Sequence, residues 1–213
     1  TRLGFDISSN KSDQHYSSEY SFPFDTLLSN LMSNNQQRMI VQLQSDLTWQ
    51  LKNGIKTETG LKGSWQQYSS EANYFTIYNT IQVADSSRNN KYNFNEGIFA
   101  AYTQASKTIW GGLVLKAGCR LEYTYMSGKQ KRPTDTSFLV NRADLFPYLY
   151  ISRDLPTLLP NIIPIKLRTF LIYRRTIARP EYGQLNPSRE YVDPYLYEAG
   201  NPDLKPQFTN NIE

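Results

Sequence analysis

Two segments of the chain alternate between apolar and polar residues with a period of two for about thirteen residues each: Met39–Leu51 and Leu113–Tyr125. Odd positions carry most of the apolar residues in both segments. An average strand of a soluble protein has ~5–6 residues, whereas a tilted strand needs ~9–11 residues to cross a bilayer. This pattern therefore predicts membrane-spanning β-strands.

Weaker copies of the same alternation predict six more strands. They are Leu3–Ile7, Ile55–Trp65, Glu96–Ala105, Leu145–Ile151, Ile165–Tyr173 and a strand that begins at Phe208. Alternation at 73–83 predicts a further hairpin above the membrane, and Pro147 predicts that its strand is irregular or begins there.

The predicted strands are joined by short and long connections in turn. Short links are expected at 52–54, which contains the hairpin signal Asn-Gly, at 106–108 and, somewhat longer, at 152–164. Long polar loops are expected at about 9–38, 66–94, 127–143 and 176–205. Outer-membrane barrels combine short periplasmic turns with long extracellular loops, so we predict an all-β, antiparallel, up-and-down transmembrane β-barrel.

Composition agrees with a barrel. The chain has 16 Tyr and 10 Phe, and no apolar run approaches the ~18 residues of a membrane helix. Aromatic residues fall near both ends of the predicted strands, as in the two interfacial girdles of a membrane barrel. These residues are Trp49, Trp110 and Tyr150 at the periplasmic end and Trp65, Tyr123 and Tyr125 at the extracellular end.

Few residues have the chemistry of a catalytic or metal site. A single cysteine, Cys119, excludes an internal disulfide, and a single histidine, His15, argues against His-based catalysis or zinc binding. The net charge of +4 comes from scattered basic residues, which gives nucleic-acid binding little support. We expect a protein that is not an enzyme, holds no cofactor or metal, and does not bind nucleic acid.

Several motifs occur in a fixed order in the second half of the chain. They are Phe94-Asn95-Glu96, Ala117–Glu122, Asp144–Pro147, Arg174–Pro180, Leu185-Asn186-Pro187 and Gly200–Pro206. Together they resemble the barrel of TonB-dependent outer-membrane receptors, and most closely a receptor-like outer-membrane β-barrel family common in Bacteroidetes. Gln207 stands where that family usually has Glu, and the first 90 residues carry no diagnostic motif.

The resemblance implies a location in the bacterial outer membrane and a role in transport. In such receptors these motifs lie in the middle of a barrel of about 22 strands. The chain begins at Thr1 and ends as a strand begins, so we expect an internal barrel fragment of about eight strands. The implied partners are outer-membrane lipid, a plug domain, a TonB-type energy-coupling protein, and an unknown small ligand or a surface lipoprotein.

Two groups of residues are candidates for contact with a ligand. Charged residues predicted to face the lumen either meet the plug and substrate or pair with one another, Arg120 with Glu122 first of all; they are Lys116, Arg120, Glu122 and Arg168. The 176–205 loop either binds a ligand by stacking and charged hydrogen bonds, or folds back onto the barrel through its prolines and Gly200. Its candidate ligand-binding residues are Arg179, Tyr182, Arg189, Tyr191 and Tyr195.

Two other functions compete with ligand import. One is an outer-membrane barrel that anchors or assembles a surface complex without transport. The other is a soluble, secreted carbohydrate-binding β-protein. The latter predicts that apolar residues facing lipid in a barrel would instead form its core: Val41, Leu43, Leu113, Leu115, Leu167 and Leu171.

Overall fold

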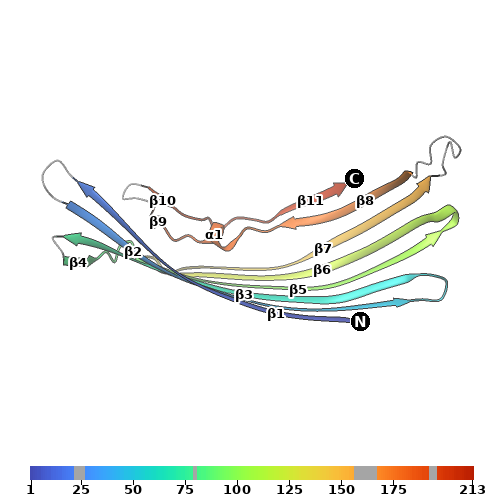
Figure 1. The fold of residues 1–213 in the computed structure, drawn as a ribbon, viewed down its shortest axis with the longest axis horizontal. Coiled ribbons are helices and arrows are strands. Elements are labelled where there is room, and N and C mark those ends of the chain that lie inside the picture. Colours follow the sequence, from blue (N-terminus) through green and yellow to red (C-terminus); the bar gives the residue numbers. More distant parts are fainter. Residues whose placement is uncertain (22–26, 79–80, 156–166, 192–195) are drawn as a thin grey trace.

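One open, curved sheet of antiparallel strands makes up nearly all of the structure (Figure 1). The computed structural model describes residues 1–21, 27–78, 81–155, 167–191 and 196–213. The sheet has the order β1-β2-β3-β5-β6-β7-β8-β11, and β4 pairs with β3 alone. The bounds are β1 Arg2–Ser21, β2 Leu27–Gln50, β3 Lys56–Tyr78, β4 Ile81–Ala84, β5 Asn90–Ile109, β6 Leu113–Arg132, β7 Thr136–Leu155, β8 Leu167–Ala178 and β11 Gln207–Ile212.

The eight predicted strands are confirmed in the predicted order, as an antiparallel meander from β1 to β11. Their predicted lengths were wrong. β1, β5, β6 and β7 have 20 residues each, β2 has 24 and β3 has 23. As a result, three ranges predicted as loops, 9–38, 66–94 and 127–143, lie mostly in strands. The range 176–205 remains a long connection, which runs from Arg179 to Pro206 between β8 and β11.

The two ends of the sheet differ in their connections, and we call them the turn end and the loop end. At the turn end, the Leu51 N–H donates to the Ile55 carbonyl at 2.8 Å, which leaves residues 52–54 as the turn and confirms the predicted link. Asn53 and Gly54 in this turn both have positive φ. The link predicted at 106–108 was wrong, because β5 continues to Ile109 and the turn is the 3-10 helix Trp110–Gly112. Residues 156–166 of the third predicted link lie outside the described part of the chain.

Two local predictions had opposite outcomes. The hairpin predicted at 73–83 is confirmed, because β4 folds back onto Phe75–Tyr78 of β3. The prediction that Pro147 starts or distorts its strand was wrong, because β7 runs straight through it. Pairing of β7 with β8 begins only at Tyr148, so Pro147 lies where β7 has one neighbour and a missing N–H is tolerated.

Even-numbered and odd-numbered residues face opposite sides of the sheet. From β1 to β7 the register pairs even with even and odd with odd residues across every main-path strand pair, apart from a bulge at Lys91. The exposed large hydrophobic side chains of β1, β2, β5, β6 and β7 are all odd-numbered, whereas buried hydrophobic residues of β3, β5, β6 and β7 are all even-numbered. Odd residues therefore face outward, and even residues line the concave wall.

An apolar band covers the outward face toward the turn end. We define it by the outward residues of β5 from Gly97 to Lys107 and the residues in register with them. Ten residue steps cover about 33 Å along a strand, which at a tilt of ~40° gives a height of about 25 Å, the value typical of membrane barrels. Outward positions 97–105 and 115–125 carry no charged residue.

Aromatic residues border this band. Trp65 stacks on Tyr125 at its upper edge, with ring centroids 5.9 Å apart, and Trp110 at the turn end is 95% exposed. Tyr150 does not belong to the lower girdle, because it pairs with Lys116 and faces the concave wall. That part of the prediction was wrong.

The predicted core of a soluble β-protein is absent from the described residues. Leu43, Leu167 and Leu171 are each about half exposed, and Leu115 is also exposed. The alternative of a soluble, secreted β-protein was therefore wrong. No helix in the described ranges is long and apolar enough to span a membrane.

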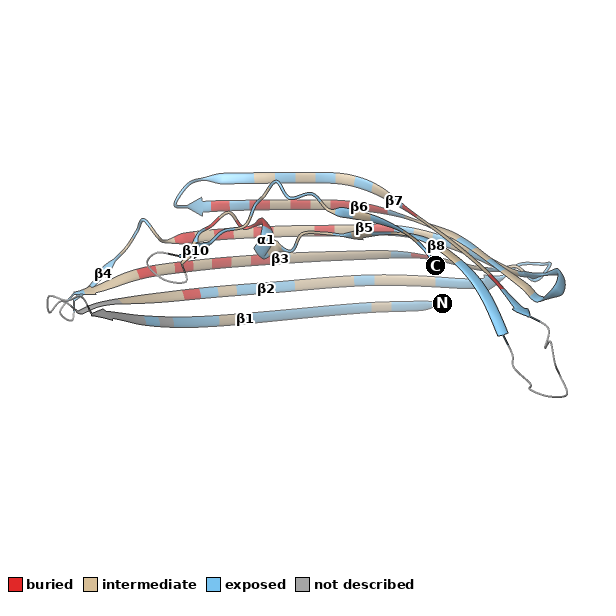
Figure 2. Cartoon of the chain, turned by 90° about the horizontal axis from the view of Figure 1, so that it is seen from above, coloured by how far each residue is buried: buried red, intermediate tan, exposed pale blue. Residues whose placement is uncertain are grey.

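The buried core lies on the concave wall near the loop end, where most buried residues gather beneath the helical turn α1 (Tyr182–Leu185) (Figure 2). Tyr68 of β3, Tyr92 and Phe94 of β5 and Met126 of β6 pack there with Leu185. Partly buried Phe138, Val140 and Tyr182 surround this cluster. The core thus joins four strands to a segment that follows β8.

Candidate functional site

The segment between β8 and β11, residues 179–206, folds back over the concave wall, and we call it the return loop (Figure 1). Its first element is α1, capped by Glu181, whose N–H donates to the Gln184 side chain at 2.9 Å. The capped turn directs Leu185 into the core, where only 2% of the residue is exposed. The prediction that this loop folds back onto the barrel is confirmed.

Tyr182 is held by the wall. Its ring lies 4.1 Å from that of Tyr68, centroid to centroid, and the Arg38 guanidinium lies over it at 5.5 Å. Arg38 in turn donates to the Gln66 side chain at 3.1 Å. Burial raises the pKa of Tyr68 to about 12, so that phenol stays neutral at physiological pH.

Two hydrogen bonds attach the middle of the loop to the wall. The Asn90 amide donates to the Arg189 carbonyl at 3.2 Å, and the Tyr191 N–H donates to the Tyr74 hydroxyl at 3.2 Å. The Tyr191 ring meets that of Tyr74 edge-on at 5.7 Å, and Arg88 lies over it at 4.8 Å. Such contacts each contribute about 0.5–1.5 kcal/mol.

A short ribbon forms the outer part of the loop. β9 (Glu190–Tyr191) pairs with β10 (Tyr197–Glu198), which places Tyr191 opposite Tyr197 and Glu190 opposite Glu198. Arg189 lies over the Tyr197 ring at 4.9 Å. Burial, and then the Glu198 charge, raises the pKa of Glu190. Like charges directly opposite one another destabilise a ribbon.

The Gly200–Pro206 motif closes the loop. Gly200 donates to the Asn186 carbonyl and Asn201 to the Gln184 carbonyl, both at 2.7 Å. A Cβ on Gly200 would collide with the Gln184 backbone. The motif therefore requires glycine because two backbone segments approach closely.

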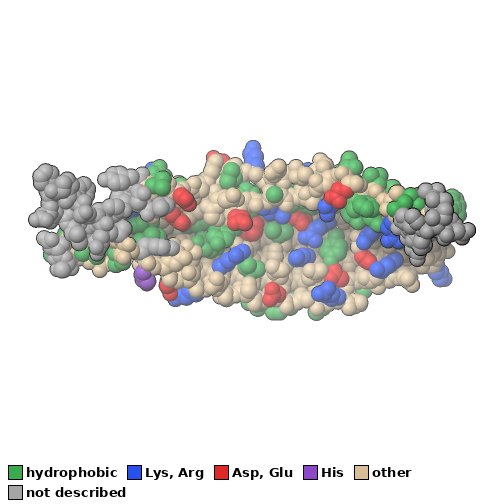
Figure 3. Space-filling model, turned by 45° about the horizontal axis from the view of Figure 1, so that its top comes forward, with side chains coloured by type: hydrophobic (Ala, Val, Ile, Leu, Met, Phe, Trp, Pro, Cys, Tyr) green, Lys and Arg blue, Asp and Glu red, His purple; other side chains and the backbone are tan. Residues whose placement is uncertain are grey.

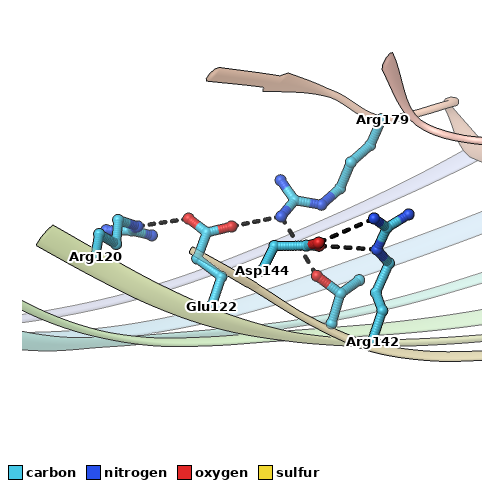
Figure 4. A network of polar contacts seen from close by, with 6 residues as sticks. Arg120, Glu122, Arg142, Asp144 and Arg179 are labelled. Atoms are coloured by element: carbon cyan, nitrogen blue, oxygen red, sulfur yellow. Dashed lines mark hydrogen bonds and ion pairs between the residues drawn. The ribbon is translucent and has the colours of Figure 1, made fainter. Parts of the chain in front are cut away.

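A charged cluster lies where the return loop leaves β8 (Figure 4). Arg179 points down from the loop and donates to Glu122 and, at 3.3 Å, to Thr124 of β6. Arg120 contacts the other carboxylate oxygen of Glu122 at 2.5 Å, so the predicted Arg120–Glu122 pair is confirmed. Arg142 and Asp144 of β7 form a bidentate pair beside it, at 2.8 and 2.9 Å. The Glu122 side chain is only 9% exposed, so its two guanidinium partners compensate a buried charge.

Charges elsewhere on the concave wall are also paired. Lys116 lies over the Tyr148 ring at 5.9 Å, and Arg168 holds Asp154 with two hydrogen bonds at 2.7 and 3.2 Å. Lys56 and Glu58 pair at 2.6 Å. In Figure 3 basic and acidic side chains are interspersed over the visible face, without a large patch of one sign. Several charges of the wall thus have a carboxylate or aromatic partner.

The structure describes four of the five predicted ligand-binding residues and places them in two different surroundings. Arg179 is bound to the wall and Tyr182 is packed against it, whereas Arg189, Tyr191 and Tyr197 form a cluster at the loop end. Tyr195 lies outside the described residues.

Sequence reasoning missed the wall residues that contact Tyr182 and Tyr191. They are Arg38, Tyr68, Tyr74 and Arg88. Tyr68, Ala72 and Tyr74 stand at even positions of a run whose odd positions 69, 71 and 73 are polar, which was a usable signal. In the described part of the chain no group of three His, Cys, Asp or Glu side chains could hold a metal ion.

Comparison with known families identifies the class of protein. The model of the outer membrane protein beta-barrel family matches residues 2–213. The chain therefore belongs to this family, and it is a β-barrel protein of the bacterial outer membrane. None of the curated proteins matches the chain.

Proposed function

We propose that the chain is a wall segment of a TonB-dependent, receptor-like transporter, which binds a ligand at its extracellular loops and imports it. The order of motifs from Phe94 to Pro206 supports a receptor of this kind. Further strands would complete the barrel, because the outer edges of β1 and β11 have no neighbour in the described sheet and unpaired strand edges are costly in lipid. A plug domain and a TonB-type protein are the partners this function requires.

The observation that carries the proposal is the aromatic and basic cluster at the loop end. The Tyr191 and Tyr197 rings are tilted against each other with their centroids 5.7 Å apart. The Arg88 guanidinium lies 4.8 Å from the centroid of Tyr191, and that of Arg189 lies 4.9 Å from the centroid of Tyr197. Tyr197 is 46% exposed. Aromatic faces beside guanidinium donors bind sugars, peptides and carboxylate-bearing chelates by stacking and charged hydrogen bonds.

The experiment measures uptake in cells that produce the native protein. Ferric siderophores, cobalamin and defined oligosaccharides are offered one at a time as labelled probes, with and without a protonophore. We expect one probe class to accumulate only with the protein and an energised inner membrane. The combined variant Arg189→Ala and Tyr197→Ala should reduce this accumulation about tenfold or more, whereas Lys205→Ala should not.

A structural barrel is the second candidate, and the paired wall charges favour it. Arg120, Arg168 and Lys56 each have a carboxylate partner, and a paired charge attracts a passing substrate less than a free one does. This function predicts that no probe accumulates and that the protein co-purifies with a surface lipoprotein after mild detergent extraction. Uptake that persists after TonB is deleted would contradict the transporter.

A further inference from the structure

We infer that the free edge of β4 binds a short extended peptide at the cell surface, as an added strand. β4 pairs with β3 on one side and with no strand of the described sheet on the other. It lies at the loop end, beyond Trp65 and near the left-hand end of Figure 1. The inference goes beyond the proposed function, because this edge lies outside the Tyr191 and Tyr197 cluster and peptide binding requires no transport.

The backbone groups that β4 presents at its free edge follow from its pairing with β3. Asp85, directly after β4, donates its N–H to the Tyr74 carbonyl at 2.8 Å, so its N–H points toward β3. Successive residues of an antiparallel strand point their N–H and C=O groups to opposite edges. The N–H and C=O groups of Gln82 and Ala84 therefore point away from β3, and among the described residues they have no partner at this edge.

The edge of β4 carries no residue that would block a further strand. Charged side chains and proline usually protect exposed strand edges, whereas β4 reads Ile81-Gln82-Val83-Ala84. All four residues are exposed. A strand of this length offers too few ladder groups to join whole sheets, but it matches the reach of a short peptide.

An exposed apolar patch flanks the same edge. The register places Tyr78 opposite Ile81 and Thr76 opposite Val83, and paired residues share one face of a sheet. Tyr78 is 53% exposed, Ile81 67% and Val83 49%, although this end of the sheet lies in water. Alternate side chains of an added strand would lie beside Ile81 and Val83 and cover them. The patch therefore favours a peptide with apolar residues at alternate positions.

The turn that follows β4 fixes the position of this edge. Arg88 donates its N–H to the Asp85 carbonyl at 3.2 Å, and its guanidinium lies 3.3 Å from the Asp85 carboxylate. Ser87 donates its N–H to the same carboxylate at 3.1 Å. The Asn89 side chain accepts the Tyr74 N–H at 2.8 Å, which ends the ladder between the two strands. An edge that is ordered beforehand loses little entropy when a peptide binds.

A second copy of the chain fits this edge poorly. Two identical antiparallel strands are related by a twofold axis perpendicular to both, whereas two copies in one membrane share an axis along the membrane normal. Strands of a membrane barrel are tilted by only ~40° from that normal, and β4 runs alongside β3. A short peptide in solution has no such constraint, so it is the occupant that the geometry favours.

The test uses the native protein purified in detergent and a synthetic peptide in which valine alternates with threonine. The peptide has a lysine at each end for solubility, and a photoreactive diazirine side chain replaces one valine. After irradiation, the labelled yield is measured against peptide concentration, and mass spectrometry locates the labelled residues. A control peptide carries N-methyl groups on two neighbouring central residues, so that each of its edges lacks a donor.

We expect labels on β4 and on the paired end of β3, and about tenfold weaker labelling by the N-methylated peptide. Gln82→Pro removes an outward N–H, which an edge strand tolerates, and should also weaken labelling about tenfold. The matched control Gln82→Ala keeps the N–H and should be labelled like the parent protein. Val83→Ser removes apolar area from the patch and should weaken labelling about fivefold.

Three results would overturn the inference. They are equal labelling by the two peptides, labels located away from β4, and unchanged labelling of both Gln82→Pro and Val83→Ser. Labelling that falls as the protein concentration rises would assign the edge to a second copy and would overturn it as well. If Gln82→Pro fails to assemble, the N-methylated peptide still decides the outcome. Because no step requires transport, the peptide site can fail or stand independently of the proposed function.

Discussion

The two halves of the sheet have opposite polarity although the same strands run through both. In the half nearer the turn end, β6 places Leu121 and Tyr123 outward and Arg120 and Glu122 inward. In the half nearer the loop end, the same strand places Ser127 and Lys129 outward and Met126 inward. The direction in which odd residues point does not change, but the medium on each side does.

This inversion arises because each strand passes through two media, lipid in one half and water in the other. Lipid surrounds the lower half, so apolar side chains are favoured outside and polar ones inside. Above the membrane the outer face meets water, and the inner face packs against the return loop in a small core of the kind found in soluble proteins. The apolar phase of the alternation therefore switches from odd to even where the strand leaves the bilayer.

The largest expected effect comes from the core above the membrane. Phe94→Ala removes a ring that is 1% exposed, and we expect a loss of about 3–5 kcal/mol in the free energy of unfolding. Phe99→Ala, on the same strand but facing lipid, should cost less, because lipid can fill the space. Urea unfolding of the protein in lipid vesicles measures both. Equal losses would contradict the division into two halves.

The free-energy cost of a charge on the outward face should depend on which half of the sheet carries it. Leu121→Arg places a charge within the apolar band, with an expected cost of about 2–4 kcal/mol. Ser127→Arg, six residues further along the same face, should cost almost nothing, because water surrounds it. Folding yields in lipid vesicles would distinguish the two variants. A low folding yield for Ser127→Arg would mean that the membrane boundary lies nearer the loop end than Ser127.

The close approach of Gly200 to the Gln184 backbone gives a smaller effect, confined to the loop half. Gly200→Ala should destabilise docking of the loop by about 1–3 kcal/mol through overpacking. Faster tryptic cleavage at Arg189 on intact cells measures this change. The control, Gly183→Ala, adds a methyl group with no neighbour within 4 Å and should leave cleavage unchanged.

The smallest expected effect is a pH dependence of loop docking through Glu190. Its carboxyl faces Glu198 on the ribbon, Tyr68 and Tyr74 on β3, and the Asn186 amide at 3.4 Å. Burial and Glu198 raise the pKa of Glu190 in the docked loop, so the docked state binds a proton more tightly than the open one. Docking should strengthen as pH falls through this raised pKa.

The measurement is the rate at which a membrane-impermeant maleimide labels Thr124→Cys, a buried position in contact with Arg179. This rate is divided at each pH by that of Lys129→Cys, an exposed position on the same strand. Acidification should slow the normalised rate in the parent protein. Glu190→Gln should label slowly across the range and lose most of the pH dependence. A normalised rate that rises on acidification would contradict the assignment.

The sequence alone predicted the membrane half well and the loop half poorly, for one reason. A period of two with a constant apolar phase, as in Leu113–Tyr125, identifies a strand in lipid. Beyond Tyr125 the apolar residues Met126, Phe138 and Val140 stand at even positions. A test for one continuous phase fails there, so the sequence predicts loops where the strands in fact continue.

The candidate site was predictable only in part. The residues of the return loop stood out by composition, and Arg120 with Glu122 stood out by spacing. Their partners on the wall come from segments about 60 to 150 residues away in sequence, such as Arg38 for Tyr182 and Glu122 for Arg179. Such pairings depend on the register of five strands, which local patterns do not encode.

The closed pair of Ala178 with Gln207 has a consequence for insertions between β8 and β11. Because the two ends of the return loop leave from neighbouring strands, residues added within the loop do not alter the register of the sheet. Lengthening a loop with such a closed base costs little additional entropy. Added length is best tolerated at the β9–β10 ribbon, because Leu185 and the Gly200 contact hold the two ends of the loop to the wall and to each other.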